Sequence, residues 1–341
     1  MMRQARRSDC GRVLDGKYEL VGLVEFVGDR DRTSLWKGVV HGAAGFTRDV
    51  AIRKLPSSTA VRQAALHGAA LEHANVVRVY DVCRDEDDNL YLVMEWVDGV
   101  ALGDLIRGAR QLGLRVPWPL VGCIGVGALH GMAAGHGRTA VDGAPMPVVH
   151  GHLTARSVLL DRRGVVHLTP FGLADGEVAA TGERPSIAGD LRDLGVALWE
   201  ALTGSTPPDG DCTSAPSSLH AVLERAMIQD AAAGFASADE MAAGLAATLG
   251  SIPWRRGPQA DLGDAVKEVI AALAWSPSEP VRDPASEPGA PVVLVHLPPR
   301  ALAAARWLAL EPRLERRMPF DHSDEPGDDD EPYATYELRR S

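Results

Sequence analysis

From Lys17 to about Trp96 the chain consists of short runs of β-branched and aromatic residues, each closed by a turn. Such runs predict β-strands. Five strands are expected: YELVGLVEF (18–26), SLWKGVV (34–40), DVAIRKL (49–55), VVRVYDV (76–82) and NLYLVMEWV (89–97). The acidic turn at 84–89 joins the last two as a hairpin, and VRQAALHGAALEHA (61–74) is the one helical pattern in this half.

Beyond Gly99 the pattern changes to Ala-, Leu- and Gly-rich stretches that predict helices. These helices are expected at 101–112, 117–136, 189–203, 216–229 and 237–248. A strand lobe (16–98) followed by a helical lobe (99–250) predicts an α+β arrangement with a cleft between the two lobes. The apolar run from Trp118 to Gly135 is long enough to span a membrane, but its glycines and His130 favour a buried helix and no membrane span.

The two ends of the chain differ from this central part. Residues 1–15 are basic and lack an apolar run, so a secretory signal is not expected. A C-terminal helix is predicted within 251–275, followed by a Pro- and Ser-rich linker at 276–290 and a short strand and helix within 291–318. The tail at 319–341 is acidic and is expected to be disordered.

Composition and charge exclude several classes of function. The hydrophobic content of 45% allows a sizeable core, and the net charge of −11 argues against a nucleic-acid partner, because phosphate backbones require a basic face. The four cysteines are scattered and form no C-x-x-C pair, so neither a zinc site nor a disulfide framework is expected. We expect reduced thiols and a cytoplasmic protein.

Six segments, in this order along the chain, resemble the bacterial serine/threonine protein kinases of eukaryotic-like type, over roughly residues 16–250. They are VAIRKL (50–55), HANVVRVYDV (73–82), LYLVMEWVDG (90–99), VVHGHLTARSVLL (148–160), VVHLTPFGLA (165–174) and DLRDLGVALWEALTG (190–204). The resemblance implies a protein-kinase-like bilobal fold, with a five-stranded N-lobe that carries one helix and a mainly helical C-lobe. It also implies that the activity, where present, transfers a phosphoryl group from ATP with magnesium.

The residues that perform this chemistry in the family are replaced here. In the family's H-R-D-L-x-x-x-x-N loop, the proton-accepting aspartate corresponds to His152 and the metal-binding asparagine to Ser157. The metal-binding aspartate of D-F-G corresponds to Pro170. Magnesium prefers hard oxygen ligands, usually including carboxylates. We therefore predict no metal site and no catalytic residue.

The ATP-gripping positions are altered as well. Arg53 occupies the position of the V-A-I-K lysine, and Ala64 occupies the position of the helix glutamate that usually pairs with that lysine. The glycine loop retains Gly28 alone. The segment DGEVAATGERPSIAG (175–189) is short and lacks the A-P-E signature, while Gly234 replaces the arginine that pairs with that signature. The degenerate site predicts little phosphotransfer.

Other family positions are retained. The resemblance gives His150, Phe171, Gly172 and Asp190 structural roles around the loop. It also names weak candidates for nucleotide contact, namely Gly28, Ala51, Arg53, Glu95, Val97 and Leu159. We expect no cofactor, and leave open a weak, metal-independent binding of ATP or ADP at the hinge.

The sequence thus favours a pseudokinase that acts in signal transduction as a scaffold or allosteric regulator through protein–protein contacts. The partner is an unknown protein, such as an active kinase or its substrate. Expected contact surfaces are the helix at 61–74, the cleft mouth and the C-terminal extension. One alternative is a weakly active, atypical serine/threonine kinase that uses Arg53 and His152. A second is a sensor that binds a non-nucleotide ligand in the reshaped cleft.

Overall fold

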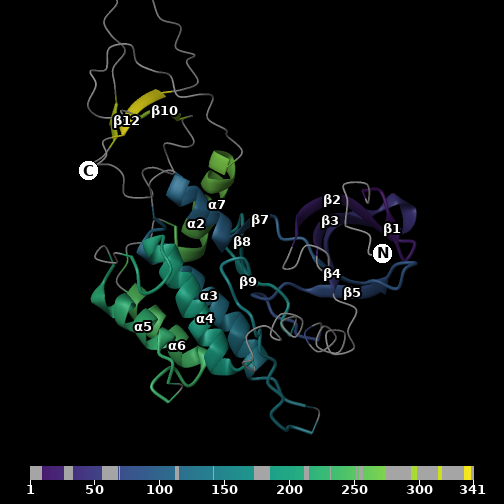
Figure 1. Cartoon of the computed structure of the whole chain (residues 1–341), viewed down its shortest axis with the longest axis horizontal. Coiled ribbons are helices and arrows are strands. Elements are labelled where there is room, and N and C mark those ends of the chain that lie inside the picture. Colours follow the sequence, from purple (N-terminus) through teal and green to yellow (C-terminus); the bar gives the residue numbers. More distant parts are fainter. Residues whose placement is uncertain are drawn as a thin grey trace, which may run out of the picture.

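The computed structural model describes most of the two lobes and parts of the C-terminal extension. The described residues are 10–26, 34–55, 68, 70–111, 115–140, 142–172, 185–210, 215–230, 232–250, 252, 256–273, 293–297, 314–316 and 334–338. Figure 1 shows a strand-rich lobe beside a helical lobe, with short strands between them. This α+β architecture confirms the predicted fold class.

The N-lobe is built on one antiparallel six-stranded sheet in the order β1-β2-β3-β4-β6-β5. Its strands are β1 (Val13–Leu14), β2 (Tyr18–Phe26), β3 (Ser34–His41), β4 (Thr47–Leu55), β5 (Val79–Arg84) and β6 (Leu90–Glu95). The five predicted strands are present. The fourth begins three residues later than expected, because Val76 instead forms a bridge with Leu168 of the other lobe. Of the helix predicted at 61–74, only Gly68 and residues 70–74 are described. Gly68 is helical, but 70–74 are turn and irregular structure, so the predicted helix extends too far at its C-terminal end.

Alternation along β4 positions side chains on the two faces of this sheet. Val50 and Ile52 join Trp36 in a cluster on one face, whereas Ala51 joins Leu92 and other residues on the opposite face. Because successive strand residues point to opposite sides, Arg53 lies on the same face as Ala51. That face carries the N-lobe residues of the candidate site.

The C-lobe packs six described helices around one large apolar core. They are α2 (Leu102–Gln111), α3 (Trp118–His136), α4 (Ile187–Thr203), α5 (Ser217–Met227), α6 (Ala238–Leu249) and α7 (Pro258–Leu273). Local signals fix several ends: Ser186 and Ser237 cap α4 and α6 by accepting hydrogen bonds from the backbone N–H groups of Gly189 and Glu240. These helices agree with the predicted ones to within about three residues at each end.

Among the described helices, α3 alone is long and apolar enough, by length and composition, to cross a membrane. More than half of its apolar window is buried, and it contacts α4, α6 and β9. Its glycines allow this close packing, since a Cβ at Gly127 would lie 2.8 Å from Val166. It is the central helix of the C-lobe core.

A small three-stranded sheet, β7 (Gly99–Ala101), β8 (Val158–Asp161) and β9 (Val166–Leu168), lies at the junction of the lobes. The segment before β5 is hydrogen-bonded to this sheet. The Asn75 side-chain amide donates to the Val166 carbonyl at 2.8 Å, and the Val77 N–H donates to the Leu168 carbonyl at 2.8 Å. The sheet therefore connects the two lobes directly.

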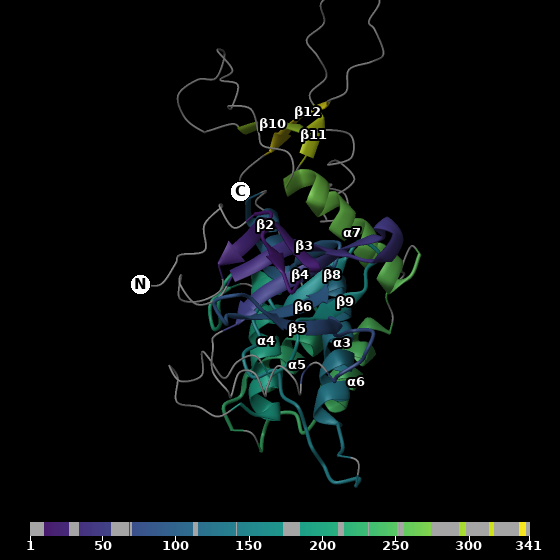
Figure 2. The same ribbon diagram turned by 90° about the vertical axis from the view of Figure 1, so that its right-hand side faces the viewer.

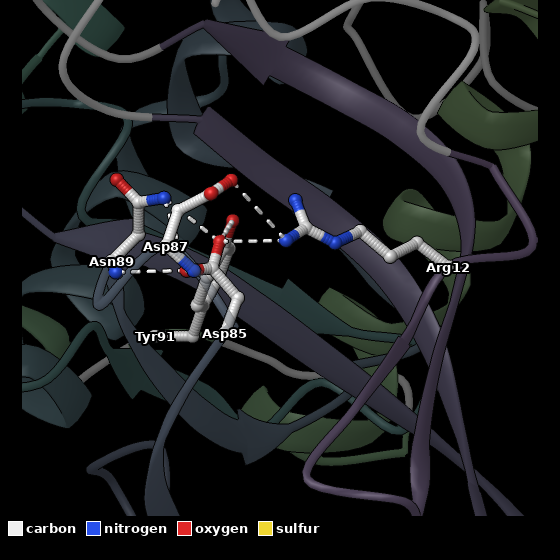
Figure 3. A network of polar contacts seen from close by, with 5 residues as sticks. All are labelled: Arg12, Asp85, Asp87, Asn89 and Tyr91. Carbon is white, nitrogen blue, oxygen red and sulfur yellow. Dashed lines mark hydrogen bonds and ion pairs between the residues drawn. The ribbon is translucent and has the colours of Figure 1, made fainter.

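A polar network attaches the start of the described chain to the β5–β6 turn (Figure 3). The Asp85 carboxylate accepts hydrogen bonds from Asn89 and from the Tyr91 hydroxyl, and it lies 3.1 Å from the Arg12 guanidinium. Burial alone would raise the pKa of Asp85, but these hydrogen bonds and the Arg12 charge hold that pKa below its ordinary value. The acidic turn predicted from the sequence is thus a structural anchor for β1.

The C-terminal extension corrects two predictions. Its described strands, β10 (Val293–Leu297), β11 (Leu314–Arg316) and β12 (Ala334–Leu338), form a sheet in the order β10-β12-β11. Residues 314–316 were expected to be helical, and 334–338 were expected to be disordered. Both expectations were wrong, because pairing between segments distant in sequence determines these strands, and local composition does not reveal it. The acidic run at 321–331 and the linker lie outside the described residues.

Candidate functional site

Asp190 organises the loop that begins at His150. It lies in the first turn of α4 and is 1% exposed. One carboxylate oxygen accepts the backbone N–H of His150 at 2.7 Å and also contacts the His136 Nε2 at 2.9 Å, while the other accepts the Gly151 N–H at 2.7 Å. Hydrogen bonds to an ionised carboxylate are among the strongest in proteins. This one side chain thus fixes the path of the loop backbone.

His150 and Phe171 pack against each other beneath the lobe junction. Their rings lie 5.3 Å apart in an edge-on arrangement, and Phe171 is fully buried. The His150 Nε2 lies 3.1 Å from the Thr169 hydroxyl. Burial lowers the pKa of His150 to about 4, against the opposing charge of Asp190 and with help from the charges of Arg53 and His152. His150 is therefore a neutral ring at physiological pH.

The Phe171–Gly172 segment has little room to move. A Cβ on Gly68 would lie 2.3 Å from the Phe171 carbonyl oxygen, and a Cβ on Gly135 would lie 2.7 Å from the Phe171 ring. Gly172 has a φ of +73° and donates its N–H to the Val149 carbonyl at 3.2 Å. Pro170, which precedes Phe171, is buried and lacks an N–H. Glycine is needed at position 68 for this close approach.

His152, in the position of the family's proton acceptor, is exposed. On the other side of His152, Asp193 of α4 accepts the Leu153 N–H at 3.3 Å. Burial raises the pKa of Asp193 above its ordinary value, and the neighbouring Asp190 charge raises it further. The hydrogen bond from the Leu153 N–H shows that Asp193 supports the loop.

Ser157 is part of a local turn. It is buried, its hydroxyl accepts the Thr154 N–H at 3.3 Å, and its carbonyl accepts the Thr169 N–H at 2.9 Å. Its hydroxyl therefore already stabilises the loop.

Protein kinases use magnesium, and the residues present do not fit that ion. At the two positions that bind the metal in the family, Ser157 has a hydroxyl and Pro170 has a side chain with no oxygen to bind a metal ion. Across the described ranges, no group of three or more His, Cys, Asp or Glu side chains is arranged to hold a metal. Magnesium normally needs at least one or two carboxylates. We therefore derive no chemical step through a metal at this site.

The positions that would flank an adenine lie in one apolar cluster. Ala51 of β4 is 8% exposed, and Leu159 of β8 packs against the cluster that contains Ala51 and Met94. In the hinge between β6 and β7, the Glu95 N–H donates to the Arg78 carbonyl at 2.8 Å. No backbone hydrogen bond in the described part of the chain involves Val97. The hinge thus offers an edge to which a planar ring could bind.

Arg53 is half-buried on β4, opposite Leu35 and Leu92. Alternation places its side chain on the same face as Ala51, and its charge helps to lower the pKa of His150. The other two altered ATP positions, Gly28 and Ala64, lie outside the described residues.

Sequence reasoning missed three residues of this site. His136 bonds to Asp190 from the end of α3, Asp193 supports Leu153, and Gly68 lies against Phe171. The pattern on α4, in which Asp193 follows Asp190 by three residues, was visible and places both carboxylates on one helix face. No local pattern indicated the other two contacts.

Comparison with known proteins agrees with this geometry. Residues 21–186 match the family model described as protein tyrosine and serine/threonine kinase. The kinase domain of PknI from Mycobacterium tuberculosis superposes with a TM-score of 0.55 at 19% identity, over 70% of this chain and 98% of that one. The fold is therefore that of a protein kinase domain.

Two curated relatives extend the comparison. Serine/threonine-protein kinase PrkC of Bacillus subtilis is 25% identical over an alignment of 233 residues that covers 59% of this chain and 32% of PrkC. A probable serine/threonine-protein kinase of Clostridium perfringens is 26% identical over 229 residues, covering 59% of this chain and 31% of that protein. The chain thus spans about a third of the length of these relatives. The segment that matches the kinase family model is thus similar in sequence to bacterial serine/threonine kinases.

Proposed function

We propose that this chain is a pseudokinase, a kinase-like domain that acts by binding other proteins in a signalling pathway. One observation carries the proposal. The loop and the Phe-Gly segment keep a buried frame that is hydrogen-bonded to Asp190, while the proton-accepting and metal-binding positions hold His152, Ser157 and Pro170. Loss of a general base alone costs roughly 10²–10⁴ in rate. With the metal ligands also replaced, little phosphotransfer is expected.

The proposed role is that of a scaffold or allosteric regulator in the cytoplasm. Its partner would be a protein, such as an active kinase or the substrate of one. The proposed contact surfaces are the mouth of the expected cleft, near His152, the segment at 61–74 and the C-terminal extension. Affinity capture with the full chain, compared with a chain that ends after α7, tests whether the extension binds the partner. A cut at residue 250 is unsuitable, because α7 packs into the C-lobe core.

Weak nucleotide binding without a metal is part of the proposal. The apolar positions Ala51 and Leu159 and the free hinge edge at Val97 support it. Thermal-shift titration with ATP and ADP, with magnesium and with a chelator, tests this binding. Equal and small shifts in both conditions are expected. A shift that requires magnesium would contradict the proposal, because it would reveal metal ligands that the site lacks.

Two other functions make different predictions. A weakly active, atypical serine/threonine kinase would use Arg53 and His152 as its cationic and basic groups, and its phosphotransfer would disappear in His152→Ala. A sensor of a non-nucleotide ligand would show thermal shifts with metabolite mixtures but not with nucleotides. The incomplete set of catalytic groups favours the pseudokinase over the weakly active kinase. The free hinge edge at Val97 favours it over the sensor of a non-nucleotide ligand.

A further inference from the structure

The helix α7, which the sequence indicated as part of a separate C-terminal extension, is built into the C-lobe. Leu262, Ala265 and Val266 are buried in the C-lobe core, and Val266 has no exposed surface. The helix contacts α2 and α3 of the lobe and also β7 and β8 of the junction sheet. Figure 2 shows α7 running close to the β8–β9 hairpin. Its position therefore brings it next to the segment that joins the two lobes.

The contact between α7 and the β8–β9 turn is made backbone to backbone. A Cβ on Gly263 would lie 2.7 Å from the Arg163 carbonyl carbon and 2.9 Å from the Arg162 carbonyl oxygen. From the other side, a Cβ on Gly164 would lie 1.9 Å from the Gln259 carbonyl oxygen. Neither contact can be relieved by rotating a side chain, because the atoms approached belong to the main chain. The helix α7 can pack this closely against the β8–β9 turn only because residues 164 and 263 are both glycine.

The β8–β9 turn is also hydrogen-bonded to the hinge between β6 and β7. The Arg162 N–H donates to the Asp98 carbonyl at 3.1 Å, and the Arg162 Nε donates to the Asp98 carboxylate at 3.0 Å. Next to Asp98, a Cβ on Gly99 would lie 1.9 Å from the Leu160 carbonyl oxygen. The turn itself is stiffened by the buried Asp161. Its carboxylate accepts the backbone N–H groups of Arg163 and Val165 at 2.9 and 2.8 Å.

We propose that α7 is a clamp on the interlobe hinge, which keeps residues 95–101 rigid for as long as the helix is docked on the β8–β9 turn. Arg162 connects the two halves of the clamp, since its carbonyl faces Gly263 while its N–H and guanidinium hold Asp98. In the sequence, α7 is followed by the extension that carries β10 and β12, so the extension is covalently attached to the clamp. The clamp does not depend on whether the site is catalytic.

Hydrogen exchange measured by mass spectrometry on the full chain tests the clamp. In Gly263→Ala, the added methyl group forces α7 away from the turn, although alanine favours helix more than glycine does. We expect exchange to become at least about tenfold faster both in α7 and in residues 95–101, with little change in α4. The matched control is Gly250→Ala, where the nearest atoms lie 3.6 and 3.8 Å from the new Cβ and exchange should not change.

Two further variants make every result decisive. Val266→Ala removes buried methyl groups without a clash, and should loosen α7 and the hinge together but less strongly. Gly125→Ala in α3 crowds Leu245 and Leu198 within the same lobe, and should lower the melting temperature without accelerating exchange at the hinge. The clamp is refuted if α7 exchanges faster in Gly263→Ala while residues 95–101 do not, or if α7 is unaffected. It is also refuted if Gly125→Ala loosens the hinge as much as Gly263→Ala does.

Discussion

Two parts of the same loop differ sharply in how the protein holds them. The inner part is buried: the rings of His150 and Phe171 pack against each other, and Asp190 accepts the backbone N–H groups of the loop. The outer part carries His152, which is exposed, and Ser157, whose hydroxyl serves a local turn. The inner part determines the shape of the loop, whereas the outer part would have to supply chemistry. The comparison teaches that the conformation of this loop depends on residues other than those at the positions of the family's reactive groups.

The largest expected effect is on the inner part, through Asp190. Asp190→Ala would leave the N–H groups of His150 and Gly151 buried without their acceptor. We expect the free energy of unfolding to fall by about 3–5 kcal/mol, measured by urea denaturation. The control is Asp49→Ala, which removes a half-exposed ion pair with Lys37 and should cost less than about 1 kcal/mol. Equal losses in the two variants would show that Asp190 does not organise the loop.

The next largest expected difference in stability is between substitutions of Phe171, in the inner part, and of His152, in the outer part. Phe171→Ala creates a cavity at a fully buried position, and we expect a loss of about 3–5 kcal/mol in the free energy of unfolding. His152→Ala changes an exposed side chain and should alter that free energy by about 0.5 kcal/mol or less. The two variants are compared in the same denaturation experiment. A larger loss for His152→Ala would mean that the outer part also holds the loop.

Acid should weaken the inner part through His150. Its pKa is about 4 in the folded protein and 6.5 in the unfolded chain, so the unfolded chain binds more protons as the pH falls. Its contribution to stability is therefore present above about pH 6.5 and is lost as the pH falls toward 4. From this group alone, the free energy of unfolding should fall by about 2 kcal/mol between pH 7 and pH 5.

A substitution isolates this effect. His150→Phe keeps an aromatic ring against Phe171 but removes the titrating group and the contact with Thr169. It should lower stability at pH 7 by about 1 kcal/mol, yet show a clearly smaller loss than the natural chain between pH 7 and pH 5. Identical pH profiles for the two proteins would assign the acid sensitivity to other groups.

The sequence predicts those parts of the fold that depend on local pattern. Runs of β-branched residues indicated five N-lobe strands, and apolar periodicity indicated the C-lobe helices and α7. Among the strands it missed, β1 and β7 are two or three residues long, β11 was assigned to a helix, and β12 was assigned to a disordered tail. Their formation depends on partners elsewhere in the chain. Short segments carry too little pattern to reveal such partners.

The candidate site shows the same division. The resemblance to kinases located His150, His152, Ser157, Pro170 and Asp190, because these positions keep a fixed spacing in the sequence. It did not reveal that His136 bonds to Asp190 across 54 residues, or that Gly263 lies against the β8–β9 turn. Such contacts arise from packing between distant segments. A glycine that packs against backbone looks like any other glycine in the sequence.

The central claim is that the outer part of the loop no longer performs phosphotransfer. Radiolabelled ATP, incubated with the full chain and magnesium or manganese, alone and with generic protein substrates, tests it most directly when His152→Ala is measured alongside. The account predicts equal, background incorporation of phosphate for the natural chain and for His152→Ala. Incorporation well above background that disappears in His152→Ala would contradict it, because the exposed histidine would then be a working base.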